Sequence, residues 1–446
     1  MKSFFYSYKL IFAAIISLFI ISCSSDNNSS DSGDTDSVDE NKSIEIFSWW
    51  TSPGEAQALQ ALVDVFTDDY PNVDVINVSA ELGHGQDAKT VLNERMAAND
   101  PPDTFQLGPR DLQTWIEYDG DTSDNRLVSL DELFKSEGWD KDFPREVLDV
   151  VSYNGHYYAV PVGMHRQNTL YYNTSLIKSS EIPTTIEELF TLAEKLKSEG
   201  ITPFAISAGT GGWTLEIAFF SILAGSQGAQ FHSDFYSGKL DMTDDANVAK
   251  LTAGIDDYLT FLTYTNDDAG DLGWDAAAKL VYDGDAAMYI HGDWATGYFT
   301  SLGWKPGVDF NAVPVTGSED EFIYGVDAFA LCKDAPDEQN AKNFLKAIGS
   351  PEAQAAFNII KGSSPVNPNV DTSEWNSLAK ATLEQLKNAT VLHNVEVNQF
   401  SVPGATAKDA ATGIADQLLN LYTGDITKDE FISWIVDNYK AATSGE

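Results

Sequence analysis

The amino-acid sequence predicts an α/β fold, and three observations support this prediction. Strand-like and helix-like segments alternate along the chain from residue 44 onward, and such alternation is typical of helices packed on largely parallel sheets. The chain has 446 residues, of which 43% are hydrophobic. This is ample for a large core, and more than one domain is expected at this length. No internal repeat or coiled-coil pattern competes with this interpretation.

The individual elements follow from apolar periodicity. Residues 44–47 predict a short apolar strand, and residues 73–78 alternate as a second strand. Residues 185–199 predict a helix and residues 203–206 a strand, and the pattern is mostly helical from Trp375 onward. The helix expected between the first two strands has one apolar face and ends before Pro71; the face consists of Leu59, Leu62, Val63, Phe66 and Tyr70.

Two extended apolar segments that contain glycine are candidates for the places where the chain changes domain. They are residues 158–163 and 322–327. Terminal strand positions of this kind can absorb the rotation of a hinge.

The N-terminus has the pattern of an export signal. Lys2 and Lys9 precede an apolar run over residues 10–21, which is too short for a membrane span of about 20 residues and suits a signal peptide. The run ends at Cys23, as in bacterial lipoprotein signals, which implies cleavage after residue 22 and acylation of Cys23. An ordinary secretory signal with an incidental cysteine is the alternative. Residues 23–42 are almost entirely polar, so they predict a disordered tether.

The net charge excludes some classes of partner. The chain carries 68 acidic and 27 basic residues, a net charge of −41, whereas phosphate binding requires basic patches. Nucleic acid is therefore not an expected partner, and anionic membrane surfaces are disfavoured. With Cys23 acylated, Cys332 is the remaining cysteine. No disulfide is then possible, and its apolar neighbours predict a buried, inert thiol.

The common catalytic and metal-binding motifs are missing from the sequence. It contains no phosphate-binding Gly-Lys-Ser/Thr loop and no Gly-x-Ser-x-Gly elbow. Asp119, Asp121 and Ser123 begin like a calcium loop, but Asp124 occupies the position that needs glycine. The six histidines lack metal-ligand spacing. We therefore expect a protein without enzymatic activity, cofactor or metal.

Six segments of the chain resemble, in order, those of a known family. They are Trp49 to Glu55, Pro101 to Gln106, Tyr158 to Val162 with His165 and Arg166, Ala286 to Trp294, the segment around Asp327, and Lys361 to Val366. From about residue 43 to its end, the chain thus resembles the extracellular solute-binding proteins of carbohydrate ABC importers, most closely the glucose-binding branch.

This resemblance implies a periplasmic-binding-protein-like fold of two α/β lobes, with crossing strands as the hinge and a ligand cleft between the lobes. One lobe would comprise residues 43–163 and 322–380, and the other residues 164–321 and 381–446. It also implies a monomer, exported and held by its lipid at the periplasmic or cell-surface side of the membrane, that delivers a sugar to permease and ATPase subunits.

The candidate stacking residues are tryptophans. A sugar ring presents apolar C–H faces, and aromatic side chains offer large flat surfaces for them. Adjacent residues of a strand point to opposite faces, so one of Trp49 and Trp50 can face a cleft while the other packs inward. The resemblance implies that Trp50 is a stacking plate, with Trp49 more structural, and that Trp274 is the plate of the opposite lobe. Core packing is the alternative for Trp49, Trp50 and Trp294, and packing of a surface-loop residue on its own lobe is the alternative for Trp274. Trp213, after two glycines, is a weaker candidate.

Charged and polar residues are the candidates for binding hydroxyl groups. By resemblance Glu55, Asp327 and Lys361 hydrogen-bond the sugar. Glu55 also suits the start of a helix, and Asp327 lies in an apolar segment where an unpaired carboxylate would be costly. Either a ligand or Lys361 would satisfy Asp327.

The sequence departs from the glucose-binding pattern at two positions. Where the glucose-binding pattern often has a Lys or His toward the sugar, this chain has only Gln106 and Arg110 as substitutes. Where the pattern has a C-terminal His, His393 is out of register, so Asn398 or Gln399 is the available substitute. His165 is a further polar candidate or a structural histidine. A sugar is therefore expected and glucose is provisional. A surface glycan-capture lipoprotein without an importer and a secreted glycosidase are the alternatives.

If Trp50 is a stacking plate, the substitution Trp50→Ala is expected to weaken sugar binding and to leave the melting temperature of the sugar-free protein nearly unchanged.

Overall fold

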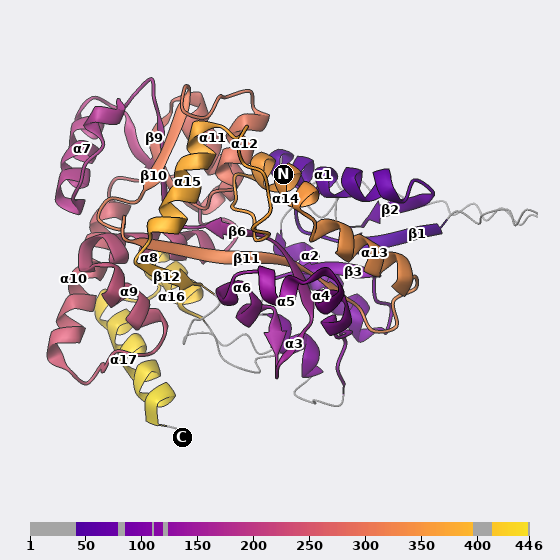
Figure 1. Ribbon diagram of the computed structural model, residues 1–446. Coiled ribbons are helices and arrows are strands. Elements are labelled where there is room, and N and C mark those ends of the chain that lie inside the picture. Colours follow the sequence, from indigo (N-terminus) through magenta and orange to yellow (C-terminus); the bar gives the residue numbers. More distant parts are fainter. Residues whose placement is uncertain (1–41, 79–84, 109–110, 119–123, 396–412, 445–446) are drawn as a thin grey trace, which may run out of the picture. The chain divides into compact units, whose positions relative to one another are not determined.

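The computed structural model describes residues 42–444 except 79–84, 109–110, 119–123 and 396–412. The described residues form two lobes, each built on one β-sheet with its own hydrophobic core (Figure 1). The predicted signal peptide and nearly all of the predicted tether lie outside these residues, and so do Cys23, Arg110 and Asn398. Within the described ranges, no helix combines the length and apolar character needed to cross a membrane.

The first lobe contains a six-stranded sheet. Its strands are β1 (Lys42–Phe47), β2 (Val73–Asn77), β3 (Thr104–Leu107), β6 (Ala159–Arg166), β11 (Glu321–Leu331) and β12 (Val391–Asn394). The order is β12-β11-β3-β1-β2, and β6 also pairs with β11. β1 is parallel to β2 and β3, and β12 is parallel to β11, whereas β11 is antiparallel to β3 and β6. The strands predicted at residues 44–47 and 73–78 are confirmed.

Helices cover the first sheet. They are α1 (Pro53–Asp69), α2 (Gly85–Ala97), α3 (Leu112–Ile116), α4 (Asp131–Glu137), α5 (Trp139–Asp142), α6 (Arg145–Val150), α13 (Glu338–Ile348) and α14 (Pro351–Lys361), with a hairpin of β4 (Ser152–Tyr153) and β5 (His156–Tyr157). Pro53 is the first residue of α1, where its missing N–H is not needed by the helix. Leu59, Leu62 and Phe66 are buried in α1, so the predicted apolar face is confirmed at these positions.

The second lobe contains a four-stranded sheet in the order β10-β7-β9-β8. Its strands are β7 (Thr169–Asn173), β8 (Thr202–Ala205), β9 (Ala286–His291) and β10 (Phe310–Pro314). Only the pair β8 and β9 is parallel; β7 is antiparallel to both of its neighbours. The expectation of a largely parallel sheet is therefore wrong for this lobe. β7 pairs with β9 and β10, which lie far along the chain from it, so no local connection sets its direction.

The remaining helices contribute buried residues to the hydrophobic clusters of the second lobe. They are α7 (Ile186–Ser198), α8 (Trp213–Gln227), α9 (Ala229–Tyr236), α10 (Asp245–Leu262), α11 (Trp274–Asp283), α12 (Ala295–Ser301), α15 (Ser377–Asn388), α16 (Ile414–Thr423) and α17 (Lys428–Ser444), with 3₁₀ turns at Ser179–Glu181 and Ala269–Asp271. The helix predicted at residues 185–199 is confirmed as α7. The lobe boundary predicted at residue 380 falls inside α15, where Leu378 packs with Tyr171 and Phe310 of the second sheet.

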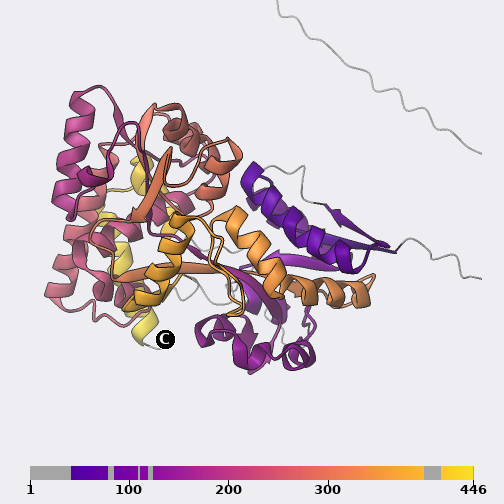
Figure 2. The same cartoon turned by 45° about the horizontal axis from the view of Figure 1, so that its top comes forward.

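β6 and β11 cross between the lobes. They pair antiparallel from Arg166 opposite Tyr324 to Gly163 opposite Asp327, and the register shifts immediately after Asp327. Figures 1 and 2 show β11 running from one lobe into the other. The two extended segments predicted at residues 158–163 and 322–327 lie in these two strands.

The predicted burial of Cys332 is confirmed. Cys332 is fully buried, and burial raises the pKa of its thiol far above the usual range.

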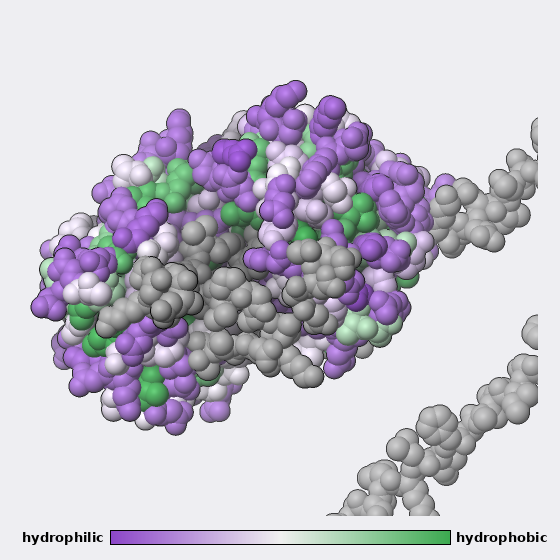
Figure 3. Space-filling view, turned by 90° about the horizontal axis from the view of Figure 1, so that it is seen from below, coloured by the Kyte–Doolittle hydropathy of each residue, from purple (hydrophilic) through white to green (hydrophobic). Residues whose placement is uncertain are grey.

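The face seen in Figure 3 carries hydrophilic residues distributed across it, with small apolar areas between them. Among the described residues, the large apolar side chains that are exposed are the isolated Ile76, Val308 and Leu392.

Candidate functional site

A cavity of about 200 Å³ lies between the two lobes. It is lined by Lys89, Gly108, Asp111, Gln167, Trp213, Glu216, Ile217, Phe220, Tyr236, Trp294, His393 and Val395. Lys89, Gly108 and Asp111 belong to the first lobe, and α8, α9 and Trp294 supply the second-lobe wall. Gln167 follows the crossing strand β6, and His393 lies in β12. The cavity is therefore bounded by both lobes and by the segments that join them.

Helix α8 supplies four of the lining residues. Trp213, Glu216, Ile217 and Phe220 are spaced three, four and seven residues from the first, which places them on one face of the helix. Gly212 precedes them, and a Cβ on it would lie 1.7 Å from the backbone oxygen of Ala415. The glycine there is required by the close packing of α16 rather than by a ligand. This packing fixes where α8 begins and so where Trp213 lies.

The first-lobe wall carries a charge pair. The ammonium of Lys89 lies 3.1 Å from a carboxylate oxygen of Asp111, and the same ammonium lies 4.8 Å from the ring centroid of Trp49. Both partners are about 40% exposed, with side-chain values of 42% and 37%. Because an exposed ion pair is weak, either side chain can leave its partner and bind a polar group of a ligand at a small cost in free energy.

An aromatic cluster surrounds Trp294 in the second lobe. The Trp294 indole donates a hydrogen bond of 2.9 Å to Nε2 of His291, and Trp274 stacks on the same imidazole with centroids 5.5 Å apart. Trp213 packs against both His291 and Trp294. Burial lowers the pKa of His291 to about 3, so its ring is neutral and can accept this bond. Trp294 is 8% exposed and is at once a core residue and a cavity wall.

The two adjacent tryptophans after β1 differ in burial. Trp50 is 1% exposed; it packs on Phe329 and Phe357, and the Lys361 ammonium lies 4.3 Å from its ring centroid. Trp49 is only partly buried. The two side chains thus differ in burial, because apolar neighbours from β11 and α14 lie on the side of Trp50.

Asp327 and Lys361 form a buried ion pair. Their side chains are 7% and 3% exposed. Nδ1 of His165 lies 3.2 Å from the same Asp327 oxygen, and Gln106 donates to the other oxygen over 3.3 Å. Burial alone would raise the pKa of Asp327, but the charges of Lys361 and His165 outweigh it and hold this pKa well below its usual range. Four predicted site residues are thus brought together, with their polar atoms directed at one another.

This buried group reaches the cavity through two contacts. Nε2 of His165 lies 3.3 Å from Nε2 of Gln167, which lines the cavity. The His165 ring also meets the Trp294 indole edge to face, with centroids 5.3 Å apart. The buried charges therefore lie directly behind the residues that line the cavity.

Glu55 lies at the start of α1, where the lobes touch. Ser52 donates a hydrogen bond of 2.8 Å to its carboxylate. Burial raises the pKa of Glu55 to about 7, with Lys361 acting in the opposite direction and Asp327 and Asp275 adding to the rise. A Cβ on neighbouring Gly54 would lie 2.3 Å from the backbone of Gly297 in α12. Glycine at position 54 therefore permits α1 and α12 to meet.

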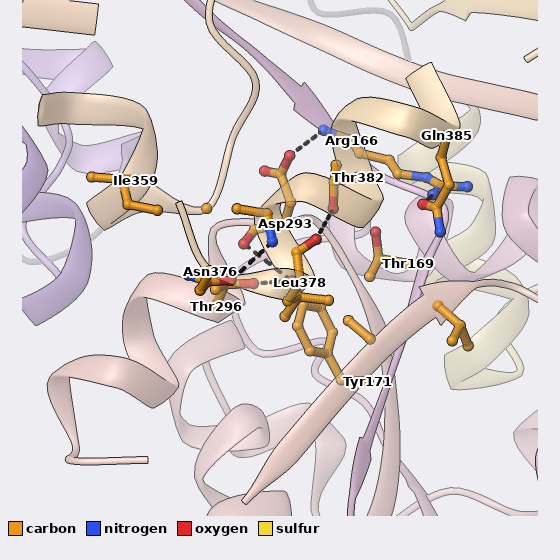
Figure 4. Close-up of a pocket in the computed structure, with 14 residues that line it drawn as sticks. Arg166, Thr169, Tyr171, Asp293, Thr296, Ile359, Asn376, Leu378, Thr382 and Gln385 are labelled. Carbon is orange, nitrogen blue, oxygen red and sulfur yellow. Dashed lines mark hydrogen bonds between the residues drawn. The ribbon is translucent and has the colours of Figure 1, made fainter. Parts of the chain in front are cut away.

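A second, much smaller pocket of about 20 Å³ lies where β6 enters the second lobe (Figure 4). Asp293 accepts a 2.6 Å hydrogen bond from the backbone N–H of Arg166, and the Arg166 guanidinium donates to Asn168 and Gln385. Tyr171 donates to the backbone oxygen of Asp293 over 3.0 Å. The volume suits about one water molecule, so this pocket is a packed polar joint rather than a ligand site.

The structure places the described site residues in three sets. Gln106, His165, Asp327 and Lys361 form the buried charged group, with Trp50 and Glu55 beside it. Trp274 and Trp294 belong to the aromatic cluster. Trp49 lies beside Lys89 of the first-lobe wall. Arg110 and Asn398 lie outside the described residues.

Several lining residues were not predicted from the sequence. Lys89, Gln167 and Glu216 carry no motif, although the i, i+3, i+4 and i+7 spacing after Trp213 was readable. His393 was considered and set aside as out of register, yet it lines the cavity. Within the described chain, no cluster of three or more His, Cys, Asp or Glu side chains is arranged to hold a metal ion.

Comparison with known proteins gives consistent results. The family model "Bacterial extracellular solute-binding protein" matches residues 50–355. An uncharacterized ABC transporter extracellular-binding protein of Pyrococcus horikoshii is 31% identical, over 97% of this chain and 99% of its own length. A probable sugar-binding periplasmic protein of Rhizobium meliloti is 30% identical, over 90% of this chain and 94% of its own.

A solved structure has the same architecture. The maltose-bound MalE3 of T. maritima superposes with a TM-score of 0.70 at 19% identity, over 89% of this chain and 99% of that one. The two-lobe fold expected from the six ordered segments is thereby confirmed. With a family model that covers more than half of the chain and relatives that align over nearly all of it, this protein belongs to the bacterial extracellular solute-binding protein family.

Proposed function

We propose that this protein is the lipid-anchored sugar-binding component of an ABC importer, and that it captures a mono- or small oligosaccharide of glucose-like hexose units as its lobes close. The observation that carries the proposal is the cavity of about 200 Å³ bounded by residues of both lobes. The curated relatives named above are ABC transporter and sugar-binding proteins, which supports the same function here.

The size and lining of the cavity support a hexose ring. An apolar cavity of about 150 Å³ accommodates benzene, so a volume of about 200 Å³ has room for a six-membered ring with substituents. Trp213 and Trp294 supply aromatic surface, which suits the apolar face of a pyranose. Lys89, Gln167 and Glu216 supply charged or amide groups, which suit its hydroxyls.

The predicted site residues keep a place in this proposal. Trp49, Trp274 and Trp294 are proposed as aromatic surfaces, and Gln106, His165, Asp327 and Lys361 as the polar group behind the cavity. Glu55 is proposed to reach the ligand from α1, and Arg110 and Asn398 to complete the site. Trp50 is proposed to support Lys361 from below rather than to stack on the sugar.

The proposed mechanism is a two-state hinge at β6 and β11. A ligand that contacts both lobes favours the closed state by the contacts it makes only there, and closure then forms a composite surface for the permease. We propose residues 43–163 and 322–380 as the first lobe, and residues 164–321 and 381–446 as the second, with β12 returning from the second segment to pair with β11 in the first sheet. Small-angle scattering tests the hinge: compaction is expected on addition of the bound sugar, and an unchanged radius of gyration contradicts it.

The anchor is proposed at Cys23, with export by residues 1–22 and a flexible leash over residues 23–42. Its test is metabolic labelling with a tagged fatty acid in a bacterial host. The wild-type protein is expected to incorporate the label and remain with membranes, and Cys23→Ser to lose both properties. Equal labelling of the variant and the wild type contradicts the anchor.

A thermal-shift screen across hexoses, pentoses and disaccharides tests the central proposal, because a ligand that binds only the folded state raises the melting temperature. At least one neutral sugar is expected to raise it, and no disaccharide is expected to be cleaved on incubation. Cleavage would favour a glycosidase, and a screen without any shift contradicts sugar binding. Neighbouring genes for permease and ATPase subunits distinguish an importer component from a glycan-capture lipoprotein.

A further inference from the structure

We propose that the cavity-lining face of α8 is the specificity wall of the cleft: Trp213 stacks on the sugar ring, and Glu216 together with Asp111 selects uncharged sugars against sugar acids. This inference rests on the proposed function, since it concerns which sugars the same cavity accepts. It assigns ligand-contacting roles to residues that the family resemblance does not supply.

The geometry of α8 is the first argument. Trp213, Glu216 and Phe220 occur at i, i+3 and i+7 and all line the cavity. An aromatic ring, a carboxylate and a second aromatic ring thus follow one another along one helix face. This sequence of groups matches a sugar ring, which presents an apolar face bordered by hydroxyls.

The surroundings of Trp213 are the second argument. The side chain is partly buried, and its ring packs against His291 at 5.6 Å and Trp294 at 6.4 Å, measured between centroids. Two second-lobe rings therefore fix its orientation while it lines the cavity. Trp50, by contrast, is 1% exposed and has Lys361 over its ring. Trp213 is the better placed of the two for stacking on a ligand.

The charge of the lining is the third argument. The described lining residues include two carboxylates, Asp111 and Glu216, and one ammonium, Lys89. The ammonium already lies 3.1 Å from Asp111, so a sugar acid would bring a third carboxylate to a lining whose described residues include two carboxylates and one ammonium. Like charges in a partly desolvated site repel, whereas the hydroxyls of a neutral sugar can donate to the same carboxylates.

Calorimetric titration of the full chain with matched pairs tests selectivity. The probes are glucose and glucuronate, and galactose and galacturonate. At least one neutral hexose is expected to bind at least about tenfold more tightly than its acid, because like-charge contacts oppose the acid. Glu216→Gln, and separately Asp111→Asn, is expected to shrink that ratio severalfold. Glu187→Gln, an exposed carboxyl on α7, is the control that leaves the ratio unchanged.

Stacking is tested separately with the neutral hexose that binds best. Trp213→Ala is expected to weaken its binding about tenfold, whereas Trp213→Phe keeps an aromatic face and most of the affinity. Trp304→Ala is the matched control, because Trp304 is also partly buried in the second lobe but packs on Tyr282 and Phe299 away from the cavity. The melting temperature of each sugar-free variant shows that it is folded.

The outcomes separate this inference from the proposed function. If a sugar acid binds as tightly as its neutral partner, or if Trp213→Ala binds like the wild type, the specificity wall is refuted while sugar binding stands. If the ratio survives both carboxylate substitutions, the assignment of Glu216 and Asp111 is wrong. If no sugar of any kind binds the wild-type protein, both proposals fall together.

Discussion

The buried charged group and the α8 wall contain similar residue types but use them differently. Asp327, Lys361 and His165 are nearly enclosed, and their polar atoms are directed at one another. Trp213 and Glu216 are only partly buried and line a cavity. The difference shows that a charged residue at a family position can be enclosed between the crossing strands and their neighbours, while residues on a helix that carry no motif line the cavity.

The physical reason is the cost of burial. A carboxylate removed from water must be paired and hydrogen-bonded, so Asp327 in β11 draws on Lys361 from α14, Gln106 from β3 and His165 from β6. These partners come from three separate segments, and β11 itself is the fourth segment of the group. The group therefore ties together the segments at the hinge, directly behind the cavity-lining Gln167 and Trp294.

The largest expected effect comes from breaking the buried ion pair. Lys361→Met leaves the Asp327 charge without its main partner, so the free energy of unfolding is expected to fall by about 3–5 kcal/mol. Urea denaturation measures it. The double variant Lys361→Met/Asp327→Asn is expected to recover most of this loss. If Lys361→Met alone costs less than about 1 kcal/mol, as for an exposed pair, the contrast between the two regions fails.

Trp49 and Trp50, which follow the end of β1, allow a second comparison between a partly buried and a buried residue. Trp50→Ala removes a ring that packs on Phe329 and Phe357, so it is expected to cost about 3 kcal/mol or more. Trp49→Ala, on the half-buried side, is expected to cost clearly less and to weaken sugar binding more. Thermal unfolding and titration of both variants decide this. An unchanged melting temperature for Trp50→Ala would restore the interpretation of Trp50 as an open stacking plate.

The titration of Glu55 is expected to make the stability of the protein depend on pH. Its pKa is raised from 4.5 to about 7, so the folded state holds this proton more tightly than the unfolded state. Its contribution therefore favours folding at low pH, declines as pH rises from about 4.5 to about 7, and levels off above that. Glu55→Gln removes the titration. The stability of this variant relative to wild type is expected to rise across that window, and a constant difference contradicts the prediction. Glu187→Gln is the control.

The smallest expected effect is that of salt. Raising the ionic strength from about 0.01 to about 0.15 M shortens the screening length from about 30 to about 8 Å. With a net charge of −41, the free energy of unfolding is expected to rise by less than about 1 kcal/mol as self-repulsion weakens. Binding of an uncharged sugar is expected to stay constant. A strong salt dependence of that binding would mean that the α8 wall recognises charge instead.

Much of the fold could be read from the sequence. Strands near residues 44–47 and 73–78, the apolar face of α1, α7, and the two crossing segments all follow from local periodicity and turn residues, because these signals depend on neighbours in the chain. The strand directions of the second sheet could not be read in this way. β7 pairs with β9 and β10, which follow it by more than a hundred residues, and only packing selects those partners.

For the site, the sequence by itself determined the identity of several participants. Asp327, Lys361, His165, Trp274 and Trp294 were all named from family segments, and the structure brings the first three together. Only the tertiary structure decided which way each side chain points. Trp50 turned inward because β11 and α14 supply its neighbours, and Trp213 came to line the cleft because α16 packs against Gly212. Burial and orientation depend on contacts between distant segments, which no local pattern encodes.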